Sequence, residues 1–142
     1  MAMPTHWFYG GKNQVEAVFG GPIHGYVAPP MHLQHSIMAL SATGGAGRGA
    51  SDGDIIGSVI NHGKKQYWER GAEYHYHCTL KAGENTLEAQ MARLAMRSMT
   101  RGGFDLDRMQ REYVEFMTTP GSHNDAYASS YHRMFFANRQ DG

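Results

Sequence analysis

Residues 85–117, NTLEAQMARLAMRSMTRGGFDLDRMQREYVEFM, contain the pattern that decides the fold class. In their first half, apolar side chains recur at the three- and four-residue spacing of one helical face: Leu87, Met91, Leu94, Ala95 and Met99. Asn85 and Glu88 have the spacing of a capping box, in which each side chain satisfies a free backbone N–H at the start of a helix. Because Gly102-Gly103 is typical of a helix end, we expect a helix between the box and this pair.

Two more helices are predicted after this one. Asp105 is a suitable N-terminal cap for the second helix, and Pro120-Gly121 is expected to stop it. The apolar stripe of the second helix consists of Leu106, Met109, Tyr113, Phe116 and Met117. The third helix is expected to start at Asn124 or Asp125, and to bury Tyr127, Tyr131, Met134 and Phe135. Three helices joined by short loops indicate an all-α packing unit over residues 83–142.

Residues 1–82 are expected to be dominated by loops. Glycine and proline pairs that favour turns punctuate them at Gly10-Gly11, Gly20-Gly21-Pro22 and Pro29-Pro30. Short helices are predicted over residues 34–42 and over residues 61–70, with an end at Gly71. The glycine-rich run at residues 44–49 lacks the Gly-Lys-Ser/Thr ending of a nucleotide P-loop, so a mobile loop over residues 43–53 is favoured over a phosphate cradle. The whole chain is therefore expected to form one mainly α domain, residues 1–142.

The composition restricts the possible partners and compartments. Thirteen Lys and Arg residues balance thirteen Asp and Glu residues, so the chain lacks the excess of positive charge that binding to nucleic acid needs. The only cysteine, Cys78, cannot form an internal disulfide bond. No apolar run approaches the ~20 residues of a membrane span, and the N-terminus has no signal-peptide pattern. We expect a soluble, intracellular, cytoplasmic protein without a nucleic-acid partner or a membrane span.

Two histidines and a cysteine raise the question of a zinc site. In an extended chain His75 and His77 lie on the same side, next to the thiol of Cys78, and His123 or His132 could supply a fourth ligand. Zinc sites are better indicated by paired ligands at two separate places, and only one such place is present. A partly buried, hydrogen-bonded aromatic segment is therefore the favoured interpretation.

The first polar loop, residues 83–86, leads into the first predicted helix. Glu84, Asn85 and Thr86 bring a carboxylate, an amide oxygen and a hydroxyl close together, and hard cations such as Mg²⁺ prefer oxygen ligands. The start of a helix also favours a nearby anion such as a diphosphate. From the residues alone, simple capping of the helix is the favoured interpretation.

The second polar loop, residues 121–125, has the sequence Gly-Ser-His-Asn-Asp and precedes the third predicted helix. Capping again explains these residue types. His123 together with Asp125 is also suited to orient or polarise a group of a substrate, as acid–base catalysis requires.

The two polar loops and the helices between them resemble the ADP-ribosylglycohydrolase family. That family has a Thr-Asp-Asp-Thr type loop that opens a helix, then a glycine-rich helix end and an aromatic amphipathic helix. Residues 83–92, 101–105 and 113–117 are the counterparts here. Residues 120–129 are similar to a substrate-side loop, and residues 3–9 resemble the tail of the family's first motif.

This resemblance implies a helical fold that holds two Mg²⁺ ions and an enzyme that hydrolyses the glycosidic bond between ADP-ribose and an acceptor. By analogy the metal ligands are Glu84, Asn85 and Thr86. The catalytic residues are Glu84, His123 and Asp125. The residues that bind ADP-ribose or an ADP-ribosylated substrate are His6, Ser122, Asn124 and Tyr127.

The chain also departs from the family pattern. Glu84 and Asn85 stand where the family has two aspartates, and His6 stands where it has a glutamate. The family's Gly-Asp-Ala motif and its C-terminal acidic metal motif are absent from the sequence, so we expect an incomplete domain. The alternative function is a catalytically inactive remnant that acts as a structural or interaction subunit, with a protein partner or a second copy covering its exposed helix faces.

Overall fold

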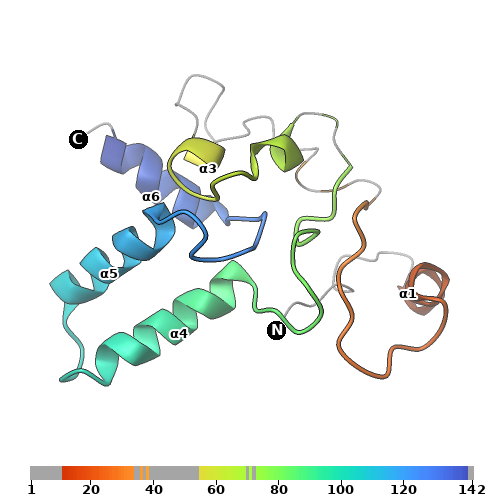
Figure 1. The fold of residues 1–142 in the computed structure, drawn as a ribbon, viewed down its shortest axis with the longest axis horizontal. Coiled ribbons are helices and arrows are strands. Elements are labelled where there is room, and N and C mark those ends of the chain that lie inside the picture. The colour runs from red at the N-terminus through yellow and green to blue at the C-terminus, as the bar shows by residue number, and fades with distance from the viewer. Residues whose placement is uncertain are drawn as a thin grey trace.

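The computed structural model describes residues 11–33, 36, 38, 55–69, 71 and 73–140 (Figure 1). Its elements are α1 (Gly11–Phe19), α3 (Ile55–Ser58), the 3₁₀ helix η1 (Lys65–Trp68), α4 (Leu87–Met99), α5 (Leu106–Thr118) and α6 (Ser130–Gln140). Within the described residues, extended pairing is limited to isolated bridges such as that between His32 and Tyr74. The predicted mainly α class is confirmed.

Helices α4 and α5 form a hairpin, as the sequence predicts. Asp105 caps α5, because its Oδ1 accepts a hydrogen bond from the backbone N–H of Arg108 at 2.9 Å. The cap of α4 differs from the prediction: Thr86 is the N-cap, and its Oγ1 accepts from the N–H of Ala89 at 3.3 Å. The expected capping box is therefore wrong by one residue at Asn85. The hairpin turn keeps its predicted place, since α4 ends at Met99 and the turn contains both Gly102 and Gly103.

Helix α6 begins at Ser130, later than the predicted start at Asn124 or Asp125. The carboxylate of Asp125 does not cap its own helix but accepts a hydrogen bond from the N–H of Leu87, the first residue of α4, at 2.8 Å. The predicted buried face is also wrong at Tyr131, whose side chain is 82% exposed. The residues of α6 that are buried are Arg133, Phe136 and Ala137.

The N-terminal half contains a helix that the sequence did not predict. Helix α1 starts at Gly11, which has a φ of +64°, and it packs Val15 and Phe19 against the core. Lys12 and Glu16 add an ion pair along the helix at 3.6 Å. Apolar packing of one face therefore outweighs the two glycines that pointed to a loop.

The helix predicted over residues 61–70 is reduced to the single turn η1. Asn61 has a φ of +50°, and its side-chain amide donates to the backbone carbonyls of Asp125 and Ala126, both at 3.1 Å. These distant contacts hold the chain out of the helical conformation. Apart from Ser36 and Met38, which are both buried, the helix and the mobile loop expected between residues 34 and 53 lie outside the described residues.

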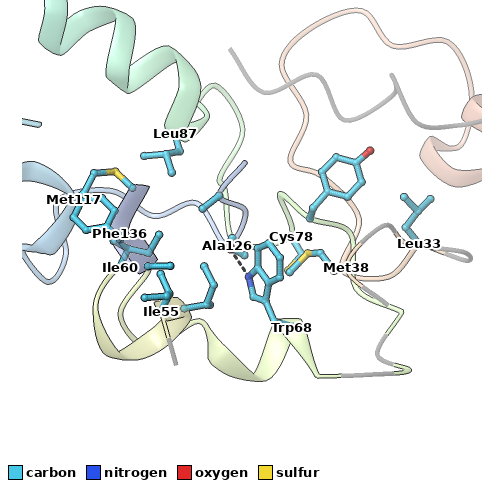
Figure 2. Close-up of a cluster of buried hydrophobic side chains, with 14 residues drawn as sticks. Leu33, Met38, Ile55, Ile60, Trp68, Cys78, Leu87, Met117, Ala126 and Phe136 are labelled. Carbon is cyan, nitrogen blue, oxygen red and sulfur yellow. Dashed lines mark hydrogen bonds between the residues drawn. The ribbon is translucent and has the colours of Figure 1, made fainter. Parts of the chain in front are cut away.

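A single cluster of buried apolar side chains draws on both halves of the chain (Figure 2). Figure 2 shows Ile55 and Ile60 beside Phe136 of α6 and Met117 of α5, with Leu87 of α4 above them. Trp68 belongs to this cluster as well, and its Nε1 donates to the carbonyl of Ala126 at 2.8 Å. Among the described helices, none has the length and apolar character that crossing a membrane requires.

Candidate functional site

The two polar loops, which are separated by about forty residues of sequence, meet at the surface. Nδ2 of Asn124 donates a hydrogen bond to Oε2 of Glu84 at 3.1 Å. Around this contact lies a pocket of about 340 Å³. Its polar lining includes Asn61, Lys64, Glu84, Ser122, His123 and Asn124. Four of the predicted site residues thus share one pocket, which also receives side chains from the N-terminal half.

Asn124 is the central residue of this pocket. Its Oδ1 accepts from the ammonium of Lys64 at 3.1 Å, while its Nδ2 also donates to the backbone carbonyl of Thr79. Its own backbone carbonyl accepts from the hydroxyl of Thr79. Both the oxygen and the nitrogen of the side-chain amide are therefore held by hydrogen bonds. The oxygen contacts the positively charged Lys64, and the nitrogen contacts the negatively charged Glu84.

Glu84 is held in its charged form. Its Oε2 accepts from the backbone N–H of Lys81 at 2.6 Å, as well as from Asn124. These hydrogen bonds, first that of Lys81 and then that of Asn124, lower the pKa of the carboxyl below its usual value. The pocket therefore contains a carboxylate at neutral pH.

His123 brings a neutral imidazole to the same pocket. Its ring stacks on that of Phe116, with centroids 6.0 Å apart. Burial lowers the pKa of His123, and the nearby carboxylate of Asp125 only partly opposes this effect. Within the described part of the chain, Nδ1 of His123 is buried and has no hydrogen-bond partner. A buried nitrogen without a hydrogen-bond partner carries a desolvation cost.

Asp125 does not line the pocket, and its side chain is 1% exposed. Oδ1 is hydrogen-bonded to Nδ1 of His77 at 2.8 Å and accepts from the N–H of Tyr127 at 3.2 Å, while Oδ2 accepts from the N–H of Leu87. Together with the contacts of Asn61 and Trp68 to the backbone beside it, this arrangement forms what we call the Asp125 junction. Its evident role is to connect the start of α4 to the rest of the core.

The remaining predicted residues lie apart from the pocket lining. Tyr127 stacks on Trp68, with centroids 5.8 Å apart and planes 9° apart, and burial raises the pKa of its hydroxyl. Thr86 is engaged as the cap of α4, and Asn85 is partly buried beside it. His6 is outside the described residues.

The residues present do not fit a centre of two Mg²⁺ ions. Among the residues that the structure describes, no group of three or more His, Cys, Asp or Glu side chains could hold a metal ion. The first polar loop offers one carboxylate, Glu84, which is already engaged by Lys81 and Asn124. The hydroxyl of Thr86 accepts from Ala89. Because Mg²⁺ demands near-octahedral oxygen coordination at ~2.0–2.1 Å, we derive no chemistry from it.

The segment with two histidines and a cysteine forms a buried, hydrogen-bonded unit. Nδ1 of His75 accepts from the N–H of His77 at 3.1 Å, and His77 in turn contacts Asp125. Burial raises the pKa of the Cys78 thiol to about 11, so the thiolate that zinc requires is disfavoured. These contacts match the interpretation favoured from the sequence.

Sequence reasoning missed the contribution of residues 61–64, Asn-His-Gly-Lys, to the pocket. The sequence predicts a helix here, whereas Asn61 and Gly63 both have positive φ values, of 50° and 74°. Asn and Gly are the residues that tolerate this conformation, so their two-residue spacing was the available signal of a polar turn. Nothing in the sequence placed this turn next to the second polar loop.

Comparisons of the chain with protein-family models, with curated proteins and with solved structures gave no match. The resemblance to ADP-ribosylglycohydrolases therefore stays a prediction. The pocket itself combines an ammonium, a carboxylate, a neutral imidazole and several amides and hydroxyls. Such a set suits a polar ligand with several hydrogen-bonding groups better than an apolar one.

Proposed function

We propose that this protein binds a phosphate-bearing sugar nucleotide of the ADP-ribose class in the pocket between the two polar loops, without a pair of Mg²⁺ ions. The observation that carries this proposal is the hydrogen bond between Asn124 and Glu84, which brings both loops to one pocket. The resemblance to ADP-ribosylglycohydrolases supplies the ligand class.

Each part of the ligand has a suitable partner in the pocket. The ammonium of Lys64 supplies the positive charge that a phosphate needs, and its hydrogen bond to Asn124 keeps it at the pocket. Glu84 accepts hydrogen bonds from sugar hydroxyls, as does the neutral ring of His123. The pocket volume of about 340 Å³ is at the lower end of the usual range for ligand sites, so it suits the ribose and phosphates with the base outside.

Binding is tested by isothermal titration calorimetry of the whole chain with ADP-ribose, in the presence of Mg²⁺ or of EDTA. We expect binding that EDTA leaves unchanged. Lys64→Gln should weaken it about tenfold or more, because a charge-assisted hydrogen bond to phosphate is lost. Lys65→Gln is the matched control, since this neighbouring lysine does not line the pocket and its loss should leave the affinity unchanged.

Three results contradict the proposal. These are no heat of binding from a chain that circular dichroism shows to be folded, an equal loss of affinity in the two lysine variants, and binding that requires Mg²⁺. The last result would instead favour the metal site expected from the resemblance.

Hydrolysis of the bond between ADP-ribose and an acceptor is the second candidate function. It is favoured by the pairing of an ionised Glu84 with a neutral His123 around one pocket, because general-base catalysis requires an unprotonated group. Release of ADP-ribose from an ADP-ribosylated peptide, followed by mass spectrometry, tests it. Loss of release in Glu84→Gln with retained binding of ADP-ribose supports hydrolysis, and absence of release by the unmodified chain rejects it.

A further inference from the structure

The turn between α4 and α5 exposes an unusual number of apolar side chains. Met96, Met99, Phe104 and Leu106 are 59%, 52%, 69% and 65% exposed. Among the described residues, these four make up half of the large apolar side chains that are exposed. Scattered single cases are normal on protein surfaces, but a cluster within eleven residues indicates a binding surface. We call residues 96–106 the hairpin tip.

The hairpin tip is an ordered turn and not a frayed helix end. The guanidinium of Arg108 donates to the backbone carbonyls of Gly103 at 2.6 Å and Ser98 at 3.3 Å, which ties the two ends of the turn together. Arg101 adds an ion pair with Glu112 at 2.9 Å. Figure 1 shows the turn at the edge of the molecule, projecting beyond the other described elements. The apolar side chains are thus presented on a convex, fixed support.

Positive charge surrounds these apolar side chains. Residues 93–111 contain five arginines and two aspartates, a net charge of +3, whereas the whole chain is neutral. The arginines are Arg93, Arg97, Arg101, Arg108 and Arg111. Glu112, just beyond this range, is paired with Arg101. Positive charge is therefore concentrated at the tip end of the hairpin, whereas Glu88 and Glu115 lie towards its other end and make the hairpin neutral as a whole.

We propose that the hairpin tip docks on the surface of an anionic lipid bilayer. A convex turn can insert Phe104 and Leu106 between lipid headgroups, whereas a protein partner would have to supply a groove around it. Arg101 and Arg108 are engaged within the hairpin, so Arg97 and Arg111 are the arginines expected to complement the negative surface potential, and a guanidinium can bind a lipid phosphate through two hydrogen bonds. This docking is peripheral and involves no membrane-spanning helix.

The proposal is independent of the pocket. The pocket includes Gln90, in the first turn of α4, whereas the tip lies at the other end of that helix. A helix of 13 residues is about 20 Å long, so a docked tip leaves the pocket clear of the headgroups. Failure of nucleotide binding would therefore not affect this inference, and the reverse also holds.

Co-sedimentation with phosphatidylcholine vesicles, with and without phosphatidylserine, tests the proposal. We expect the whole chain to bind the vesicles that contain phosphatidylserine, and binding to fall as salt screens the arginines. The double variant Phe104→Ser/Leu106→Ser should lose about tenfold or more of the binding, since two apolar anchors are removed. The double variant Arg97→Gln/Arg111→Gln should also lose about tenfold or more, at roughly fivefold for each charge.

Tyr131→Ser is the matched control, because this aromatic side chain is 82% exposed on α6, away from the tip. It should bind vesicles as the unmodified chain does, and circular dichroism should show each variant to be folded. The proposal is overturned if the folded chain does not sediment with anionic vesicles, or if Tyr131→Ser loses as much binding as the tip variant. Self-association that Phe104→Ser/Leu106→Ser abolishes, without vesicle binding, would identify the tip as a contact between copies instead.

Discussion

The α4–α5 hairpin and the Asp125 junction reach their structures by different routes. In the hairpin, helix limits follow from nearby residues: Asp105 caps the helix that begins next to it, and two glycines mark the turn. In the junction, each contact joins residues that are distant in the sequence, such as Asn61 with Asp125 and Trp68 with Ala126. The same residue type, aspartate, therefore acts locally at position 105 and at long range at position 125.

Removing the junction's carboxylate should have the largest effect. Asp125→Ala removes the carboxylate that bonds to Nδ1 of His77 and accepts from the buried backbone N–H of Leu87. Loss of such a buried network costs about 3–5 kcal/mol of the free energy of unfolding. Urea denaturation followed by circular dichroism measures this loss.

The control for this variant is Glu115→Ala, which removes an exposed carboxylate from α5 and should leave the stability nearly unchanged. A loss below about 1 kcal/mol in Asp125→Ala would mean that the junction does not hold the two halves together. Contacts between distant residues would then not stabilise the fold more than local contacts do.

Removing a local cap should have a smaller effect. Thr86→Ala deletes the hydroxyl that accepts from Ala89 at the start of α4, which costs about 1 kcal/mol. Thr86→Ser keeps the hydroxyl and should retain most of the stability, as the same denaturation measurement can show. If Thr86→Ala were as damaging as Asp125→Ala, then the start of α4 would depend on the local hydroxyl as much as on the distant carboxylate.

The sequence predicted the hairpin well because its information is local. Helical spacing, the Asp105 cap and the glycine pair lie within one stretch, so the limits of α5 followed directly from them. The start of α6 was wrong because Asp125 is a good cap by type, while its carboxylate is taken by His77 and Leu87. No local pattern reports that competition.

The candidate site, like the fold, could be predicted only in part from the sequence. The two polar loops were recognised from their residue types, and Glu84, Ser122, His123 and Asn124 do line one pocket. Lys64 was missed because its position depends on a turn that Asn61 forms with the backbone of Asp125 and Ala126. Residue types thus indicated which loops are polar, and tertiary contacts decided which of their side chains meet.

The smallest expected effect is a dependence of stability on pH, which should distinguish the two regions. All nine histidines lie outside residues 83–118, so the hairpin itself contains no side chain whose ordinary pKa lies between 5 and 7. His123 has a folded-state pKa that burial lowers from the ordinary value of 6.5. Below pH 6.5 the unfolded chain therefore binds more protons than the folded chain at this residue, and the stability falls as the pH drops towards the folded-state pKa.

The measurement is the free energy of unfolding of the chain and of His123→Gln between pH 7.5 and 5.5. The unmodified chain should lose stability over this range, and the loss should be smaller in the variant, which cannot be protonated there. Thr86→Ala should keep the full loss, because its contact is in the hairpin and involves no titrating group. An equal pH dependence in the chain and in His123→Gln would show that burial of this imidazole does not disfavour its charge, and would remove the neutral ring from the proposed pocket chemistry.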